Sequence, residues 1–433
     1  MEKCLLVTIE LDSEKDNWPR QDVAFELEEL TRTANGQVVG NIFCVRGKPT
    51  PDIFIGKGKA QEIALFCEEE KVDTVILSHD ISGTQQRNLE KVVNRKTIDR
   101  TQLILDIFSR HARSPEGNMQ VELAQLEYLL PRLHGKGVML SRLGGGIGTR
   151  GPGEQKLEVD RRRIREKIFK LKQDLKHLAG HRKLLRKKRK EDAFCVTLVG
   201  YTNAGKSTLL NAITGAEQYV KNSLFTTLDP LSRRMDLPTG GRVIFSDTVG
   251  FLHRLPHHLI EAFHATLEEV VEADLLIHVL DASHPRIQEH SKAVFDVLTQ
   301  LGCESKPSII ALNKIDLLED KVWMGWLKDK FSNSVCISAK NRRNLEQLLK
   351  KVEDFFKPEM VEVLLSVPLN KMDIVDFLYR QAKVKTAEYK AKTVELDIHI
   401  TKHMLDNILK NEGVIIVCVL SHGGQGRESR TAL

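Results

Sequence analysis

Several features typical of secreted, zinc-binding or membrane proteins are missing from this sequence. The 433 residues include only seven cysteines, which are scattered and form no C-x-x-C pair, so we expect reduced thiols and no zinc site. No apolar run approaches the roughly 18 residues of a membrane span, and the acidic N-terminus resembles a strand more than a signal peptide. We therefore expect a cytoplasmic protein without a membrane span, and peripheral membrane association stays open.

Excess positive charge is also missing from most of the chain. The net charge is +6, yet residues 155–190 alone hold 16 Lys and Arg against 4 Asp and Glu, a net of +12. The remainder therefore carries about −6. One strongly basic element on an otherwise acidic protein predicts a polyanionic partner at one place.

The sequence does contain a glycine-rich pattern, G-x-x-x-x-G-K-S, which starts at Gly200. An apolar segment at 193–199, expected to be a buried strand, precedes it, and helical spacing follows it, as in a phosphate-binding P-loop. Backbone N–H groups can cradle a triphosphate, Lys206 can reach the β- and γ-phosphates, and the Ser207 hydroxyl can bind Mg²⁺. The expected phosphate site is Gly200, Tyr201, Thr202, Asn203, Ala204, Gly205, Lys206, Ser207 and Thr208.

Three further motifs follow predicted strands at 242–246, 308–312 and 335–337. A parallel α/β sheet binds ligands at the carboxyl ends of its strands, so we expect these motifs to meet at one edge. D-x-x-G supplies a carboxylate near Mg²⁺ and an N–H group for the γ-phosphate. N-K-x-D selects guanine, because its carboxylate can accept from two neighbouring N–H groups that adenine lacks, so GTP is the expected substrate. The second switch is then Asp247, Thr248, Val249, Gly250 and Phe251, and the guanine site is Asn313, Lys314, Ile315, Asp316, Ser338, Ala339 and Lys340.

Phe251 stands where many GTPases have a catalytic glutamine. A phenyl ring can neither orient water nor stabilise charge, so we expect slow intrinsic hydrolysis, on the order of 10⁻⁴–10⁻² s⁻¹, unless a partner completes the site. Four histidines follow, which we interpret as part of a mobile switch helix rather than a metal site: His253, His257, His258 and His264.

Alternating strand and helix patterns predict a small α/β domain over residues 1–112. We expect strands near 5–11, 38–45, 52–55 and 72–77, and helices near 57–70 and 82–95. The stretch G-K-G at 56–58 opens a helix and could hold an anion, but Gln61 replaces the third glycine of a dinucleotide fingerprint. A plain strand–helix turn is the alternative.

The C-terminal residues 358–433 change in character and show no identifiable site chemistry. Their pattern is β-α-β-β-α-β, which predicts a ferredoxin-like α+β domain. The expected elements are 361–367, 371–382, 384–389, 393–400, 402–410 and 413–420.

Two segments with heptad-like apolar spacing predict an antiparallel helical hairpin over 113–190. The first is a helix over 101–134 that Ser114-Pro115 can interrupt, and the second spans 157–190, where Gly180 can end or kink it. Eight of the 19 residues from 135 to 153 are glycine. A floppy linker is one interpretation, but a connection between such helices needs only two to eight residues. A loop of glycine and arginine suits close approach to RNA, and its candidate contacts are Arg142, Gly144, Gly145, Gly146, Gly148, Arg150, Gly151 and Gly153.

Several of these segments resemble the HflX family of ribosome-associated GTPases, over roughly residues 1–355. The resemblance is carried by the P-loop and by Q-V-E-L-A-Q at 120–125, G-G-G-I-G-T-R-G-P-G-E at 144–154, D-R-R-R-I at 160–164 and F-T-T-L-D-P at 225–230. It implies binding to the large ribosomal subunit, with the glycine loop directed toward the peptidyl-transferase region. It also implies dissociation of idle or stalled ribosomes, notably under stress.

Matching to the family makes Thr227 the second Mg²⁺ ligand after Ser207. The first switch is then Phe225, Thr226, Thr227, Leu228 and Asp229.

We therefore predict a multidomain α/β protein, monomeric in solution, with a P-loop GTPase domain built on a mostly parallel sheet. The predicted parts are an α/β subdomain, a basic helical hairpin, the GTPase domain and a small C-terminal domain, at 1–112, 113–190, 193–357 and 358–433. The predicted function is GTP- and Mg²⁺-dependent ribosome dissociation through rRNA of the large subunit. The alternative is a GTP-controlled RNA-binding switch in ribosome assembly that splits nothing. A protein-binding signalling module is disfavoured, because a protein-binding coiled coil should have acidic partner residues at its e and g heptad positions.

Overall fold

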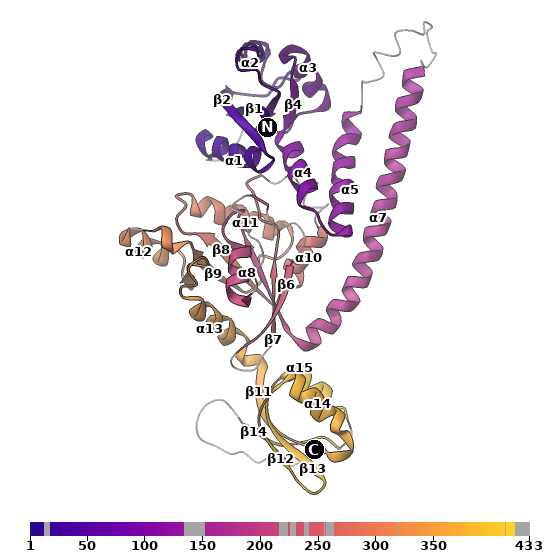
Figure 1. Ribbon diagram of the computed structural model, residues 1–433, viewed down its shortest axis with the longest axis vertical. Helices are drawn as coiled ribbons and strands as arrows, with labels where there is room; N and C mark the ends of the chain where they lie inside the picture. Colours follow the sequence, from indigo (N-terminus) through magenta and orange to yellow (C-terminus); the bar gives the residue numbers. More distant parts are fainter. Residues whose placement is uncertain are drawn as a thin grey trace. The chain divides into compact units, whose positions relative to one another are not determined.

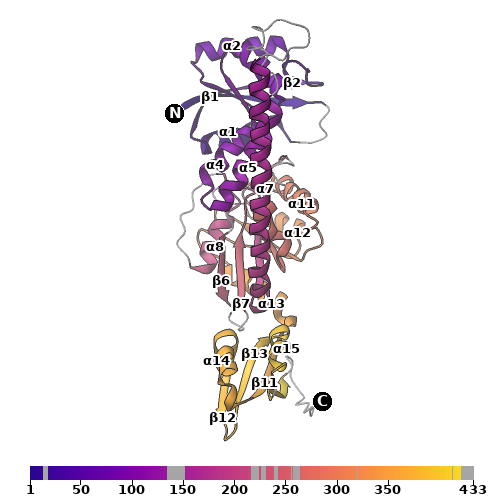
Figure 2. The same ribbon diagram turned by 90° about the vertical axis from the view of Figure 1, so that its right-hand side faces the viewer.

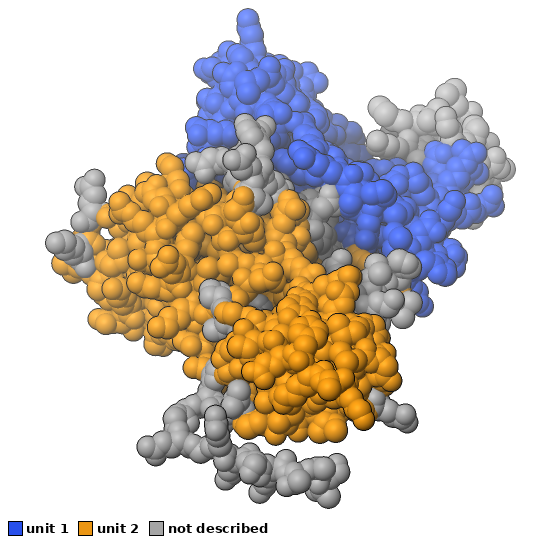
Figure 3. Space-filling view, turned by 60° about the horizontal axis from the view of Figure 1, so that its bottom comes forward, with its two compact units in different colours: residues 1–179, 221–229, 255–265 blue, residues 180–220, 230–254, 266–433 orange. Residues whose placement is uncertain are grey.

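In the part of the chain that it describes, the computed structural model contains three β-sheets with their helices (Figure 1). The chain forms two compact units (Figure 3): residues 1–179 with 221–229 and 255–265, and residues 180–220 with 230–254 and 266–433. The structure describes residues 1–12, 18–133, 152–215, 224–225, 231–237, 242–254, 256, 264–318, 320–411 and 413–420. No helix within these ranges is both long and apolar enough to cross a membrane.

The first sheet is parallel throughout, with strand order β2-β1-β3-β4. Its strands are β1 (Glu2–Leu11), β2 (Gly36–Arg46), β3 (Thr74–Leu77) and β4 (Lys96–Asp99). Its helices are α1 (Arg20–Thr33), α2 (Lys57–Glu69), α3 (Gly83–Val93) and α4 (Arg100–His111). Consecutive side chains from Leu5 to Val7 in β1 are fully buried, as expected where helices cover both faces of a parallel sheet.

The strand predicted at 52–55 is wrong. Ile53, Phe54 and Ile55 are buried, but they lie in a turn, where Phe54 has a φ of +71°. The apolar run reflects burial beneath neighbouring elements, and a run of apolar residues alone does not distinguish a strand from a buried turn. Strand β4, which the sequence patterns did not predict, completes the sheet.

Two helices form the predicted hairpin, α5 (Pro115–Arg132) and α7 (Pro152–Asp192). The break before Pro115 is confirmed, since Ser114 caps α5 by accepting a hydrogen bond from the Gly117 N–H at 2.9 Å. Gly180 does not end α7, which continues as one helix of 41 residues. The two helices lie side by side in Figure 1 and Figure 2, joined by ion pairs from Lys167 to Glu122 and from Lys172 to Glu127.

The second sheet has six strands in the order β10-β9-β8-β5-β7-β6, and only β6 runs antiparallel to its neighbour. This agrees with the prediction of a mostly parallel sheet. Its strands are β5 (Phe194–Gly200), β6 (Leu231–Asp236), β7 (Arg242–Asp247), β8 (Leu275–Asp281), β9 (Ser308–Asn313) and β10 (Ser334–Cys336). Its helices are α8 (Lys206–Thr214), α10 (His264–Glu272), α11 (Ile287–Gln300), α12 (Lys321–Lys330) and α13 (Leu345–Phe356).

The third sheet is antiparallel, with strand order β12-β13-β11-β14. The predicted order of elements is observed: β11 (Met360–Pro368), α14 (Met372–Gln381), β12 (Lys383–Tyr389), β13 (Thr393–Thr401), α15 (Lys402–Leu409) and β14 (Ile415–Leu420). Alternate residues of β13 are buried, from Val394 to Ile400, because one face of the sheet packs on the two helices.

Candidate nucleotide-binding site

The motifs at the carboxyl ends of β5, β7 and β9 come together, as expected for a parallel sheet. The Ser207 hydroxyl donates to Asp247 Oδ2 at 2.5 Å, which joins the P-loop to D-x-x-G. Asn313 Nδ2 donates to the Ala204 carbonyl at 2.9 Å, which joins N-K-x-D to the P-loop. Asn313 Oδ1 accepts from the Ala339 N–H at 2.9 Å, which adds the segment after β10.

Both P-loop glycines are required by their surroundings. A Cβ on Gly200 would lie 2.3 Å from the Val279 carbonyl oxygen of the neighbouring strand. Gly205 has a φ of +94°, and a Cβ there would lie 2.3 Å from Asn313 Nδ2. The loop can therefore approach its neighbours only with glycine at these two positions.

Lys206 is buried at the start of α8, and its Nζ donates to the carbonyls of Gly200 and Tyr201 at 3.0 Å each. Burial lowers the pKa of Lys206 to about 8, and the nearby Asp247 carboxylate opposes this shift. A buried ammonium held by two carbonyls has little freedom to lose when phosphate binds, so the group is preorganised for phosphate.

The Ser207 hydroxyl and the buried Asp247 carboxylate are both oxygen donors, and they lie together at the P-loop. Hard cations such as Mg²⁺ prefer this chemistry, so these residues fit the predicted ion. Thr227, with the rest of 226–229, lies outside the described residues.

Within the predicted first switch, Phe225 is described and buried. Its ring packs edge-on against Phe108 of α4, with ring centroids 4.5 Å apart. The preceding Leu224 N–H donates to Thr33 Oγ1 at 3.3 Å. All four residues belong to the first compact unit.

The predicted guanine-binding residues are held by contacts that the sequence did not reveal. The Ser338 hydroxyl donates to Asp316 Oδ1 at 2.5 Å, which orients the carboxylate of N-K-x-D. Lys314 Nζ forms an ion pair with Asp281 Oδ2 at 2.7 Å. Asp281 ends the apolar strand β8, so the strand-end rule that located the other motifs could also have located this residue.

Phe251 is 1% exposed, so its ring is a core side chain. Its backbone bonds to the P-loop on both sides: its N–H donates to the Gly200 carbonyl at 3.1 Å and its carbonyl accepts from the Thr202 N–H at 2.8 Å. A Cβ on Gly250 would lie 2.7 Å from Thr202 Cα, so this glycine permits close approach of the two segments. The position after D-x-x-G therefore holds the second switch against the P-loop.

Most of the predicted RNA contacts lie outside the described residues: Arg142, Gly144, Gly145, Gly146, Gly148, Arg150 and Gly151. Gly153 lies in the first turn of α7. Of the four histidines after Phe251, His253 lies in a turn and His264 begins α10, whereas His257 and His258 are outside the described residues.

The G-K-G stretch at 56–58 is explained by packing. Gly56 has a φ of +83°, and a Cβ there would lie 1.7 Å from Arg46 Nη2. The Arg46 guanidinium lies here because its Nε donates to the Ile55 carbonyl at 2.9 Å. These contacts favour a plain turn before α2 over an anion site.

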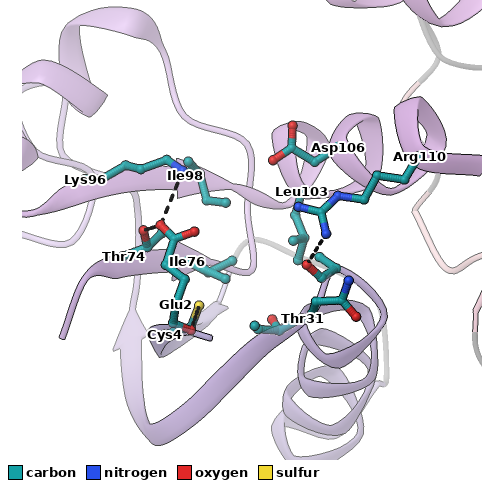
Figure 4. Close-up of a pocket in the computed structure, with 13 residues that line it drawn as sticks. Glu2, Cys4, Thr31, Thr74, Ile76, Lys96, Ile98, Leu103, Asp106 and Arg110 are labelled. Carbon is teal, nitrogen blue, oxygen red and sulfur yellow. Dashed lines mark hydrogen bonds and ion pairs between the residues drawn. The ribbon is translucent and has the colours of Figure 1, made fainter.

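A cavity of about 240 Å³ lies in the same part of the chain (Figure 4). Its lining includes Glu2, Thr74 and Lys96, near the amino ends of β1, β3 and β4, together with Asp106 and Arg110 of α4. Parallel sheets bind nucleotides at the other edge, and the lining does not include Gly56. Two cations and two carboxylates share the cavity, and Lys96 Nζ lies 3.4 Å from Glu2 Oε1. The cavity therefore offers no concentrated positive charge for phosphate.

Three protein-family models match the chain. They are described as GTP-binding GTPase N-terminal, GTP-binding GTPase middle region and 50S ribosome-binding GTPase, and they match residues 21–109, 111–189 and 195–314. A GTP-binding protein from the archaeon Sulfolobus solfataricus, solved in complex with GDP, is 25% identical, and the match covers 83% of this chain and 99% of that chain with a TM-score of 0.43.

Curated relatives match over most of their length. GTPase HflX of Caldanaerobacter subterraneus subsp. tengcongensis is 46% identical over 401 residues, which are 92% of this chain and 91% of that protein. GTPase HflX of Escherichia coli K12 is 42% identical over 369 residues, 85% of this chain and 86% of that protein. Together with the P-loop, D-x-x-G and N-K-x-D contacts described above, these similarities show that the chain belongs to the HflX family of P-loop GTPases.

Proposed function

We propose that this GTPase binds the large ribosomal subunit through rRNA and dissociates stalled or idle ribosomes when GTP is bound, notably under stress. The observation that carries the proposal is the charge distribution along α7. Lys167 and Lys172 pair with acids of α5, whereas Arg163, Lys170 and Lys176 are exposed and form no ion pair with any residue in the described ranges. Unneutralised cations on a long exposed helix favour a polyanionic partner, because binding releases counterions.

The glycine-rich loop that precedes α7 is the proposed docking element. Arg142 and Arg150 would contact phosphates or stack on bases, and the glycines from Gly144 to Gly153 would permit close backbone approach. The description of the model that matches 195–314, a 50S ribosome-binding GTPase, and the HflX names of the relatives support the choice of the ribosome as partner.

In the nucleotide site, we propose Mg²⁺ bound by Ser207 and Thr227. We also propose a slow intrinsic GTPase rate that the ribosome stimulates, because Phe251 provides no water-orienting group.

We also propose a monomer located in the cytoplasm. The same proposal divides the chain into four parts, at 1–112, 113–190, 193–357 and 358–433, of which the last is a ferredoxin-like domain. The strand order β12-β13-β11-β14 supports the ferredoxin-like fold of this last part.

Deletion of 144–153 with a short closing turn tests the proposal. GTP affinity should stay within about twofold, splitting of intact ribosomes should be abolished, and weak salt-sensitive association should persist through α7. Sucrose-gradient sedimentation with GTP or a non-hydrolysable analogue measures splitting and association on one preparation. Full splitting by the deletion variant would show that the loop is a linker. Wild-type protein that binds subunits without splitting ribosomes would favour the assembly switch.

Charge variants of α7 provide a matched comparison. Replacement of Arg163, Lys170 and Lys176 by alanine should lower the salt dependence of subunit binding, by about one unit of log–log slope for each phosphate that is no longer neutralised. The control is Lys167→Ala, which removes a cation already paired with Glu122 and should leave the slope nearly unchanged. Equal slopes for the two variants would contradict the assignment of the exposed cations to RNA.

A further inference from the structure

Tyr201, the second residue of the P-loop, makes contacts that phosphate binding does not require. Its side chain is only 5% exposed. Its hydroxyl oxygen accepts a hydrogen bond from the backbone N–H of His253 at 2.9 Å. Its ring lies flat against the imidazole of His290 in α11, with ring centroids 3.9 Å apart and an interplanar angle of 2°. One side chain thus joins the P-loop, the segment after D-x-x-G and helix α11.

The stack on His290 fixes the direction of the Tyr201 hydroxyl. His284 covers the same imidazole, with ring centroids 4.2 Å apart. Burial lowers the pKa of His290 to about 3, and the nearby His284 and His253 lower it further in the same direction. The imidazole is therefore neutral near pH 7 and can remain buried against the phenol. Since a tyrosine has two side-chain torsions to restrict, one flat contact is enough to hold its hydroxyl in place.

The hydrogen bond to His253 extends a backbone connection between the P-loop and the segment after D-x-x-G. Tyr201 and Phe251 form a parallel β-bridge, in which the Phe251 N–H and carbonyl bond to Gly200 and Thr202. The Tyr201 hydroxyl then holds the chain two residues further on, at His253. Gly250, whose N–H is expected to meet the γ-phosphate, lies immediately before the part of the chain that is held.

The absence of a catalytic glutamine makes this restraint important for the reaction. With Phe251 in the core, the water that attacks the γ-phosphate must be positioned by the backbone or by a partner, and a displacement of 1 Å can cost about 100-fold in rate. We propose that Tyr201 is a positioning residue for GTP hydrolysis, whose hydroxyl holds the backbone at His253 and so keeps the second switch, Asp247 to Phe251, in its reactive place. The proposal concerns the hydrolysis step and does not depend on ribosome binding.

The variant Tyr201→Phe tests the proposal, because it removes one oxygen and keeps the ring stack. The single-turnover rate of GTP hydrolysis by the full-length protein without ribosomes should fall about tenfold, the effect of losing roughly one buried hydrogen bond in the transition state. The dissociation constants for GDP and GTP should change by less than about twofold, since Lys206, Ser207 and Asp316 are untouched. This split between rate and affinity separates positioning from a general weakening of the fold.

Two variants of His290 sharpen the test. His290→Phe keeps a flat ring against Tyr201 and should hydrolyse GTP at the wild-type rate. His290→Ala frees the Tyr201 ring and should reduce the rate by roughly threefold with unchanged GDP affinity. Wild-type hydrolysis by Tyr201→Phe, or an equal loss of rate and nucleotide affinity, would overturn the proposal. A lack of stimulation by large ribosomal subunits would instead count against the proposed function, because the basal rate is measured without them.

Discussion

Two sheets of wholly or mostly parallel strands in this chain use their carboxyl edges in opposite ways. In the six-stranded sheet, the P-loop after β5 bonds to Asp247 at the end of β7 and to Asn313 at the end of β9, and these segments form the candidate nucleotide site. In the four-stranded parallel sheet, β4 ends at Asp99, whose side chain is fully buried. Arg132 of α5 forms an ion pair with it at 2.8 Å, and the Tyr128 hydroxyl donates to it at 2.9 Å. A helix of the same chain thus occupies the edge that the other sheet leaves for a ligand.

Topology therefore provides a possible site at this edge of each sheet, and the side chains present determine whether a ligand can bind there. Burial raises the pKa of Asp99, and Asp80 raises it further, while hydrogen bonds and the Arg132 charge oppose the shift. Arg132 also donates to the Ile81 carbonyl at 2.7 Å and stacks over the Tyr128 ring at 3.4 Å. These contacts hold the C-terminal end of α5, just before the glycine-rich loop, against the edge of the sheet that would otherwise bind a ligand.

The largest effect should come from breaking this anchor. Arg132→Ala leaves the Asp99 carboxylate buried without its cation, which should cost about 3 kcal/mol of unfolding free energy. Urea denaturation with hydrogen exchange in residues 1–133 measures the loss, and nucleotide affinity should be unchanged. Arg32→Ala is the control: Arg32 is 63% exposed and pairs with Glu28 one turn away, so its removal should cost below about 0.5 kcal/mol. Equal losses of unfolding free energy in the two variants would show that the buried Arg132–Asp99 pair does not anchor α5 to the sheet.

A smaller effect should follow from a substitution in the candidate nucleotide site, at the carboxyl edge of the six-stranded sheet. Asp316→Asn replaces an acceptor by an amide, so GTP affinity should fall by about 1–3 kcal/mol and xanthosine triphosphate should gain affinity. Competition binding with both nucleotides measures the change. Asp329→Asn, at an exposed position of α12, is the control and should change neither affinity. Unchanged preference in Asp316→Asn would contradict the guanine assignment.

The smallest effect concerns pH. The pKa of Lys206 is lowered to about 8 by burial, and the phosphates of a bound nucleotide favour the charged form, so binding of GDP or GTP above pH 8 must take up a proton. GDP affinity should therefore fall as pH rises above 8, by up to about tenfold per pH unit. For the nucleotide-free protein the sign is opposite: stability from this group is present above the unfolded pKa and is lost as pH falls through about 8.

The control for this pH dependence is Lys206→Arg, which stays charged over the whole range. GDP dissociation constants at pH 7, 8 and 9 should change less in this variant, and because guanine itself loses a proton in alkaline solution, only the difference between the two proteins is informative. Parallel curves would show that the Lys206 ammonium keeps its proton throughout.

Local patterns predicted much of the architecture. The six C-terminal elements are observed in the expected order because their strands alternate between a buried and a solvent face, as at Val394 to Ile400. The same reasoning failed at residues 52–55, where three buried apolar residues form a turn. Thr226 to Asp229 and the glycine loop stay predictions, because they lie outside the described residues.

The sequence alone determined the nucleotide chemistry, because a P-loop takes its donors from consecutive residues, Gly200 to Thr208, and D-x-x-G and N-K-x-D are equally compact. The pairs between residues far apart in the sequence become visible only in the folded chain: Asp99 with Arg132, Lys314 with Asp281, and Tyr201 with His290. Each pair joins elements whose neighbourhood depends on strand order and helix packing. The geometry of a local motif is set by residues that are neighbours in the sequence, whereas a distant pair forms only after the fold has brought two elements together.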